Sequence, residues 1–199
     1  MRALPMGPRA VLVEDVGDPA GWALGLRRLD QPGITDIVPA AATVLVTCVD
    51  ADALAALSTR LAEVVPVGPG DADRPEVVIP VIYDGADLDA VAASVGWTVD
   101  AVVAAHTGAD YVAAFCGFSP GFAYLTGLPE ELHLPRRASP RTRVPAGSVA
   151  IASTYSAVYP RESPGGWHLL GTTTAVLFDP DAAEPVLIRP GTRVRFAAC

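Results

Sequence analysis

The sequence contains no lysine, so all 14 of its positively charged side chains are arginines. A chain without lysine has no Walker-A lysine, no Schiff-base lysine and no lysine general base. Histidine is scarce as well: His106, His133 and His168 lie far apart, and none stands in an HExxH or paired-carboxylate spacing. The sequence therefore predicts no metal site of its own.

Cysteine is also rare, and long apolar runs are missing. Cys48, Cys116 and Cys199 lie without CxxC spacing, which predicts buried, reduced thiols and neither a disulfide framework nor a zinc site. No apolar run approaches the roughly 18 to 20 residues of a membrane span. The N-terminus MRALPMGPRA lacks the apolar core of a signal peptide. These features predict a soluble, cytoplasmic globular protein with no membrane partner.

Positive charge is in deficit, with a net charge of −8. Nucleic-acid binding needs a basic face that displaces counterions from phosphates, so no nucleic-acid partner is predicted. One local exception is the segment PRRASPRTR, which holds four arginines between Pro135 and Arg143. Arg136 and Arg137 fit a solvated, ion-paired loop as well as they fit a ligand site.

The first seventy residues alternate strand and helix patterns. The order is AVLVE, a helix over 19–29, ITDIV, TVLVTCV and a helix over ADALAALSTRLAEV. Such a run, completed by one more strand at its end, is typical of a split βαβ sandwich with two helices on one face of an antiparallel sheet. The Pro/Gly/Asp-rich stretch at 66–75 then predicts a domain boundary, so that residues 1–74 form an α+β lobe.

The second part, residues 75–199, begins with the strand pattern VVIPVIYDG. Two helix patterns follow, ADLDAVAASVG and TVDAVVAAHTG, each with a polar start and a glycine end. His106, near the end of the second helix, is expected to act as a cationic partner of the helix C-terminus. From Tyr111 onward, short β-rich runs punctuated by glycine and proline predict an all-β barrel or sandwich.

Residues 117–121 read GFSPG and satisfy the G-x-S-x-G pattern of a hydrolase nucleophile elbow. In an elbow, the residue after the serine starts a helix and donates its backbone N–H to the oxyanion. Here that residue is Pro120, which has no N–H and disfavours helical geometry at Ser119. We therefore expect a rigid turn and no serine nucleophile.

Three segments are richer in glycine, proline and aromatic residues than folding alone requires: GFSPGFAYLTGLP, LPRRASPRTRVPAGSVAIAS and YPRESPGGWHLLGTT. Arginine forks bind carboxylate or phosphate, and glycines admit close approach, so these segments could together line one anionic pocket. The alternatives stay open: Trp167 could cap the core, Phe122 and Tyr124 could be ordinary inward-facing strand positions, and His168 could be an exposed strand residue.

The same three segments, in this order, resemble the bacterial 5-oxoprolinase B-subunit family, also called allophanate hydrolase subunit 1 or the sporulation kinase-inhibitor family. The resemblance extends upstream through IPVIYDGADLDAVAASVGWTVDAVVAAHTGADY and, more faintly, into LVEDVGD. It implies an α+β N-terminal lobe and a C-terminal cyclophilin-like β-barrel. It also implies a hetero-oligomer with homologous C subunits and with A subunits, which converts 5-oxoproline to glutamate at the expense of ATP, with a divalent cation accompanying the nucleotide.

The resemblance also implies site residues. Arg141, Arg143, Ser163, Gly165 and Gly166 match motif positions and are expected to bind substrate or a phosphoryl group, and no catalytic nucleophile is assigned. Pro120, Phe122, Tyr124, Trp167 and His168 are expected to shape the pocket.

One position departs from the family pattern. Relatives commonly carry arginine where this chain has Thr172, which implies either an altered specificity or a lost structural salt bridge. Two other functions stay open: a carboxyltransferase component like that of urea carboxylase, and a regulatory module that inhibits a sensor histidine kinase. Prolyl isomerase activity is suggested by the expected fold alone, and no motif supports it.

Overall fold

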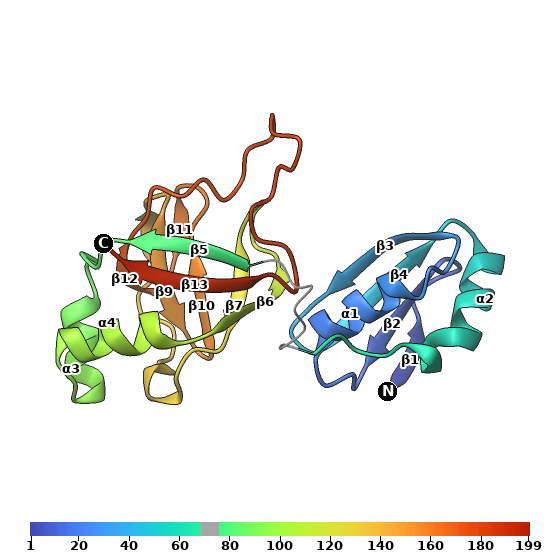
Figure 1. Ribbon diagram of the computed structural model, residues 1–199, viewed down its shortest axis with the longest axis horizontal. Helices are drawn as coiled ribbons and strands as arrows, with labels where there is room; N and C mark the ends of the chain where they lie inside the picture. Colours follow the sequence, from blue (N-terminus) through green and yellow to red (C-terminus); the bar gives the residue numbers. More distant parts are fainter. Residues whose placement is uncertain (69–75) are drawn as a thin grey trace. The chain divides into compact units, whose positions relative to one another are not determined.

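The computed structural model describes residues 1–68 and 76–199, and the chain divides into two compact units, Met1–Arg74 and Pro75–Cys199 (Figure 1). Most of the stretch predicted as a domain boundary, residues 66–75, lies outside the described residues.

The first unit is a four-stranded antiparallel sheet with two helices. Its strands, in spatial order, are β1 (Arg2–Pro5), β2 (Ala10–Glu14), β4 (Thr43–Cys48) and β3 (Ile34–Pro39), and its helices are α1 (Pro19–Arg28) and α2 (Ala51–Arg60), the latter followed by the short 3₁₀ helix η1 (Leu61–Glu63). Because β2 and β3 both pair antiparallel with β4 between them, β2, α1 and β3 form a split β-α-β unit. The fourth strand is the N-terminal β1, which precedes this unit, whereas the sequence predicted it at the end.

Acidic N-caps fix the start of both helices, and one apolar core joins the helices to the sheet. The Asp18 carboxylate accepts a hydrogen bond from Gly21 N at 3.0 Å, and Asp50 accepts one from Ala53 N at 2.8 Å, so each helix has an acidic N-cap. Strands β2 and β4 bury alternate residues, as period-2 patterning predicts. One core joins these strand residues to both helices: Val11, Val13, Val44, Val46, Cys48, Trp22, Leu26 and Leu57.

The second unit is built on a strongly curved seven-stranded sheet. Its strands, in spatial order, are β12 (His168–Thr172), β9 (Ser148–Ala152), β10 (Tyr155–Val158), β7 (Ala123–Thr126), β6 (Tyr111–Cys116), β13 (Arg193–Ala198) and β5 (Glu76–Val81). Directly after β5, Ile82 exchanges two backbone hydrogen bonds with Thr172 of β12, at 2.8 and 2.9 Å. This bridge joins the two edges of the sheet, so the sheet is nearly closed into a barrel.

Two helices and a small two-stranded sheet complete this unit. Helices α3 (Leu88–Val95) and α4 (Val99–Gly108) lie beside the sheet, as Figure 1 shows, together with the 3₁₀ helix η2 (Glu130–Leu132). Strands β8 (Arg141–Val144) and β11 (Ser163–Gly165) pair with each other in a separate two-stranded sheet. Within the described residues, no single helix is long and apolar enough to cross a membrane, and only α3 and α4 taken together, bent by 93°, would meet that length and composition.

The curved sheet has a core on each face. The larger core joins alternate residues of all seven strands to α3 and α4 and includes Ile79, Ala123, Leu125, Ile151, Leu170 and Phe196. The smaller core is on the opposite face, where Val144 of the β8–β11 sheet packs on Phe122, Tyr159, Trp167 and Leu169. Phe122 and Tyr124 therefore face away from the larger core, and Phe122 is buried in the smaller one.

The thiols differ from expectation in one respect. Cys48 is buried and Cys116 is half-buried, but Cys199 at the C-terminus is exposed, so the prediction of three buried thiols is wrong for Cys199. The reason is its position directly after β13, whose last two residues are already exposed.

Candidate functional site

The segment GFSPG forms a tight turn between β6 and β7. Phe122 N donates to Ser119 O at 3.0 Å, Pro120 occupies the second turn position and Gly121 follows with φ of +82°. This combination is typical of a type II β-turn, in which the third residue needs a positive φ that glycine adopts without strain. No helix follows Ser119, so the residues needed for a nucleophile elbow are not arranged as one, and the turn expected from Pro120 is present.

The turn carries an unusual side chain. Phe118 has φ of +63°, a left-handed backbone conformation that is costly for an aromatic residue, and its side chain is 59% exposed. Its ring is in edge-to-face contact with Phe122, at a centroid distance of 5.2 Å. Backbone strain of this kind persists only where surrounding structure imposes it, and it is common at binding sites.

Beside this turn lies a narrow cleft, which we call the aromatic cleft. Its volume is about 70 Å³, and its lining residues are Phe118, Phe122, Tyr124, Arg136, Tyr159, Pro164, Gly165, Gly166 and Trp167. The aromatic rings meet edge-to-face: Phe122 lies 5.6 Å from Trp167 and 5.4 Å from Tyr159, centroid to centroid. The cleft thus joins residues from all three segments that the sequence singled out.

Tyr159 supplies the polar group at the base of the cleft. Burial raises the pKa of its hydroxyl, while the N–H of Trp167 and the charges of Arg136 and Arg141 act in the opposite direction. The hydroxyl therefore stays protonated at neutral pH and can donate a hydrogen bond. A Cβ on Gly165 would lie 2.3 Å from the Tyr159 oxygen, so only glycine allows this approach of strand β11.

One buried carboxylate, which does not line the cleft, binds two arginines of the arginine-rich segment. Asp87, at the start of α3, is 3% exposed and accepts both Nη1 and Nη2 of Arg141 at 2.8 Å. It also accepts from Arg137 Nη1 and, at 2.8 Å, from Leu169 N. Burial acts to raise the pKa of Asp87, but the hydrogen bonds from Arg141 and Leu169 outweigh it and hold the pKa below its ordinary value. Asp87 is a residue that the sequence analysis did not single out.

The five residues expected to bind substrate or phosphate have different surroundings. Gly165 and Gly166 line the aromatic cleft. The fork of Arg141 is engaged by Asp87, and Arg143 is 75% exposed and pairs with Glu162 at 2.6 Å. The Oγ of Ser163 is buried and has no hydrogen-bond partner among the described residues.

The residues expected to shape one pocket lie in different places. Phe122, Tyr124 and Trp167 line the aromatic cleft, whereas Pro120 lines a second hollow described below. His168 lines neither; its Nε2 lies 2.9 Å from Pro135 O and donates to that carbonyl. The side chain of His168 therefore ties β12 to the arginine-rich segment.

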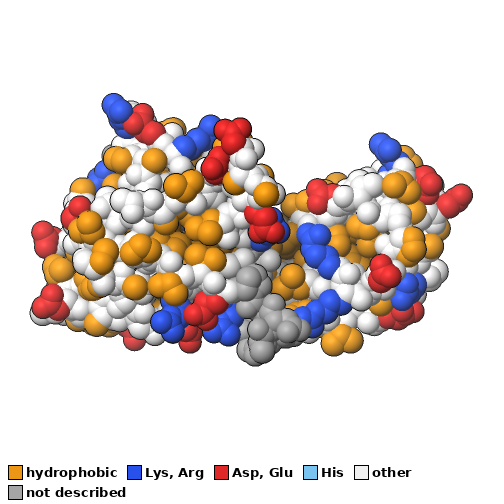
Figure 2. Space-filling model, turned by 45° about the horizontal axis from the view of Figure 1, so that its top comes forward, with side chains coloured by type: hydrophobic (Ala, Val, Ile, Leu, Met, Phe, Trp, Pro, Cys, Tyr) orange, Lys and Arg blue, Asp and Glu red, His pale blue; other side chains and the backbone are white. Residues whose placement is uncertain are grey.

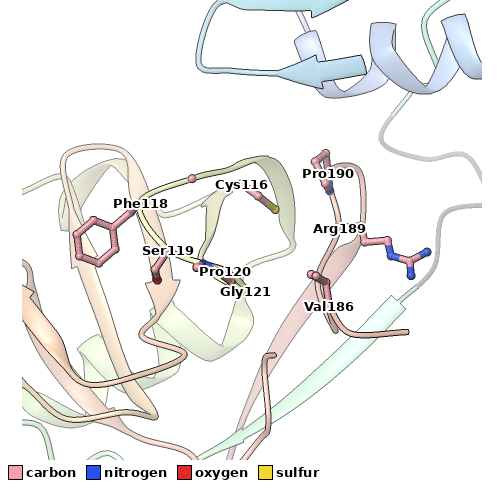
Figure 3. A pocket seen from close by; sticks show the side chains of 9 residues that line it. Cys116, Phe118, Ser119, Pro120, Gly121, Val186, Arg189 and Pro190 are labelled. Atoms are coloured by element: carbon pink, nitrogen blue, oxygen red, sulfur yellow. The ribbon is translucent and has the colours of Figure 1, made fainter. Parts of the chain in front are cut away.

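The second hollow lies on the other side of the GFSPG turn (Figure 3). It has a volume of about 530 Å³ and is lined by Cys116, the turn itself, Val186, Arg189 and Pro190. Its walls are mainly apolar, and Figure 3 shows the Arg189 guanidinium directed away from the turn. Burial raises the pKa of Cys116 to about 11, so its thiol is uncharged at neutral pH and is a poor nucleophile.

A buried polar network lies in the larger core. His106 is fully buried, with Nδ1 2.7 Å from the Tyr83 hydroxyl and Nε2 2.9 Å from Ser156 Oγ. Burial lowers the pKa of His106 to about 3, so the ring is neutral, and the expectation of a cationic partner for the helix C-terminus is wrong. Its position in the apolar run AVVAAH was the signal that could have indicated burial.

Thr172 is on the strand that carries His168, but at its far end. Its hydroxyl donates to Asp84 at 3.0 Å. Four residues along a strand correspond to about 13 Å, so Thr172 is distant from His168 and from the cleft. An arginine at this position would lie beside Asp84, which favours the structural salt bridge over a role in specificity.

Charge on the molecular surface is mixed. On the face drawn in Figure 2, arginine and acidic side chains are interspersed, with apolar side chains between them. Among the described residues, no group of three or more His, Cys, Asp or Glu side chains is placed to hold a metal ion.

Comparisons with known proteins extend this description. Residues 1–188 match the family model "Carboxyltransferase domain, subdomain C and D". The chain is 44% identical over 186 residues to a protein from Escherichia coli O157:H7 that is named as the B subunit of 5-oxoprolinase, covering 88% of this chain and 83% of that one. It is 47% identical over 123 residues to the protein of that name from Haemophilus influenzae, covering 60% of this chain and 58% of the relative.

Solved structures share the fold. TTHA0988 superposes with a TM-score of 0.81 at 36% identity; the match covers 96% of this chain and 40% of TTHA0988. The match to PH0987 from Pyrococcus horikoshii covers the whole of this chain and 97% of PH0987, with a TM-score of 0.61 and 31% identity. The urea amidolyase of K. lactis matches over 99% of this chain and 15% of its own, with a TM-score of 0.71, but at 19% identity it shows the fold alone. The match along nearly the whole chain and the identity to named relatives confirm the resemblance: this chain is a member of the 5-oxoprolinase B-subunit family, within the carboxyltransferase-domain proteins.

Proposed function

We propose that this chain is the B subunit of an ATP-dependent 5-oxoprolinase, in which it works with homologous C subunits and with A subunits to convert 5-oxoproline and water to glutamate. The observation that carries the proposal is the 44% identity to a protein of that name across 83% of its length. The relatives' name implies partner chains, and the aromatic cleft presents aromatic rings and a guanidinium group to a small cyclic substrate. The nearly closed seven-stranded sheet of the second unit supports the cyclophilin-like barrel that the family resemblance implies.

The lining of the aromatic cleft suits binding better than covalent catalysis. Among its lining residues there is no serine, cysteine or histidine, so the cleft itself offers no activated nucleophile. The cleft is lined instead by aromatic rings, by Tyr159 with its protonated hydroxyl and by the cationic Arg136. We infer that this chain binds and orients the lactam, and that it is inactive without its partners.

The residues that the structure describes do not form a site that fits ATP. The aromatic cleft, at about 70 Å³, is far below the roughly 300–1,000 Å³ of sites for nucleotide-sized ligands. The larger hollow is mainly apolar, and its arginine, Arg189, pairs with Glu184 at 3.6 Å. A triphosphate needs several converging cations or backbone N–H groups. We therefore propose that ATP and its divalent cation bind to one of the partner chains.

Reconstitution tests the function. The purified A and C subunits from the same source are incubated with ATP and 5-oxoproline, with and without this chain, and glutamate is measured. We expect glutamate only when this chain is present, and none when ATP is left out. Equal glutamate formation by the A and C subunits alone would refute the proposal.

The other functions have weaker support. The urea amidolyase and urea carboxylase of K. lactis share the fold at 19% identity, which carries no argument about substrate. If the reconstituted complex acts on urea-derived amides and leaves 5-oxoproline intact, the carboxyltransferase alternative replaces the proposal. Inhibition of a sensor kinase autophosphorylation assay by this chain alone would instead support the regulatory role.

A further inference from the structure

The four arginines between residues 136 and 143 differ in their partners. Asp87 engages Arg137 and Arg141, and Glu162 pairs with Arg143. Arg136 has no acidic partner among the described residues, and it is the arginine of this group that lines the aromatic cleft. An unpaired guanidinium beside a cleft, in a chain with a net charge of −8, is poised to attract an anion.

The backbone fixes the position of Arg136 from both sides. On one side, His168 Nε2 donates to Pro135 O at 2.9 Å; on the other, Arg137 N donates to Gly166 O at 2.8 Å. These two bonds hold the arginine-rich segment against the residues that end β11 and begin β12. Successive side chains of an extended segment point to opposite sides, so Arg136 is directed into the cleft while Arg137 reaches Asp87.

We propose that Arg136 is the carboxylate-binding residue of the aromatic cleft: its guanidinium fork holds the carboxylate of a small cyclic amide whose ring packs against Phe118 and Tyr124. Arginine forks match carboxylates in bidentate fashion, and an aromatic wall suits a flat five-membered ring. Tyr159 lines the same cleft, with its hydroxyl against Gly165. The identity of that ligand as 5-oxoproline rests on the proposed function.

Two analogues test the carboxylate and the lactam of the ligand separately. Cyclopentanecarboxylate has the carboxylate without the lactam, and 2-pyrrolidone has the lactam without the carboxylate. Each is titrated into the chain, alone and in the complex with the C subunit, and binding is followed by tryptophan fluorescence, to which Trp167 in the cleft contributes. Arg136→Ala should weaken binding of 5-oxoproline and of cyclopentanecarboxylate by about 10- to 100-fold, and binding of 2-pyrrolidone by less than about 2-fold.

Two further variants make the test specific. Arg136→Lys keeps the charge but loses the fork, so it should recover only part of the affinity for carboxylates. Arg161→Ala removes an exposed arginine that does not line the cleft, and it should leave all three affinities unchanged. In the active complex, Arg136→Ala should raise KM for 5-oxoproline by a similar factor and change kcat much less.

The outcomes distinguish this inference from the proposed function. If the reconstituted complex forms no glutamate, the proposed function fails, but carboxylate binding that is lost in Arg136→Ala still supports the site. If glutamate forms and Arg136→Ala has the wild-type KM, the function stands and Arg136 is not its carboxylate ligand. Failure of the wild-type chain and complex to bind any of the carboxylates, or equal loss for 2-pyrrolidone and cyclopentanecarboxylate, would overturn the inference.

Discussion

Lowering the pH from about 7 to about 4.5 should destabilise the second unit through His106. The ring is fully buried, stacks on Phe196 at a centroid distance of 4.5 Å and hydrogen-bonds to Tyr83 and Ser156. The described groups around it include no carboxylate that would stabilise a charged ring: Tyr83 and Tyr111 are the titratable neighbours, and burial raises the pKa of each, so both are neutral. Protonation inside the fold is therefore strongly disfavoured.

The pKa values set the size and the sign of the effect. His106 has a pKa of about 3 in the folded protein, against 6.5 for an unperturbed histidine. Because the folded pKa is depressed, the unfolded chain takes up the proton first, and the stabilisation present above pH 6.5 is lost as the pH falls toward 3. A pH of about 4.5 lies roughly two units below the pKa of His106 in the unfolded chain. Protonation at this pH therefore stabilises the unfolded state by about 2.7 kcal/mol relative to the folded state.

Urea unfolding at the two pH values measures this loss. Tryptophan fluorescence follows the transition in a Trp22→Phe background, so that the remaining reporters, Trp97 and Trp167, lie in the second unit. His106→Gln should be less stable at neutral pH, since it loses packing, but should lose about 2–3 kcal/mol less than the parent on acidification. His133→Gln, the matched control, should keep the parent's dependence.

The parent and His106→Gln could instead lose the same free energy between the two pH values. That result would show that His106 does not oppose protonation in the fold. Asp87 would not account for such a shared loss, because its pKa is lowered and its stabilising effect is therefore lost only below the ordinary pKa of an aspartate, outside this pH range.

Three further predictions concern the site. Arg141→Ala should lower the free energy of unfolding by about 3–5 kcal/mol, because it leaves the buried carboxylate of Asp87 with a single cation; a loss below about 1 kcal/mol in urea titration would show that Arg137 and Leu169 N suffice. Ser119→Ala should leave turnover of the reconstituted complex unchanged, since Ser119 Oγ has no hydrogen-bond partner among the described residues; collapse of turnover with intact fold would revive a nucleophilic role. Thr172→Arg should form an exposed ion pair with Asp84 worth at most about 1 kcal/mol, with unchanged KM for 5-oxoproline, whereas a shift in KM would give this position a part in specificity.

Much of the element order was predictable because local signals were strong. Asp18 and Asp50 occupy the N-cap positions that precede periodic apolar patterns, and Gly96 ends α3 with φ of +72°. Strand β1 was not predicted, because its burial pattern is mostly exposed and shows no period-2 alternation. The two-stranded sheet of β8 and β11 was not predicted for a similar reason: RTRV and SPG carry little apolar signal, and their pairing joins segments about twenty residues apart.

The candidate site was predictable as a set of segments and less so as a set of contacts. The three glycine- and aromatic-rich segments do meet, because the curved sheet places the β6–β7 turn beside the β11–β12 junction. The division into a cleft and a separate hollow depends on the GFSPG turn, whose two sides face different neighbours. Side-chain direction in a tight turn is set by φ values such as that of Phe118, which no sequence pattern encodes.

The arginines show most clearly what sequence reasoning lacks. Within PRRASPRTR all four are chemically equivalent forks, and motif position favoured Arg141 and Arg143. Whether each arginine is free to bind a ligand depends on acidic residues distant in the sequence. Asp87 lies fifty residues before Arg137 and reaches this segment because α3 begins against β12. A buried carboxylate that pairs with two guanidinium groups makes them less available for ligand binding and fixes the chain between them. The arginine left over, Arg136, is then both unpaired and well positioned, which is the combination that carboxylate recognition requires.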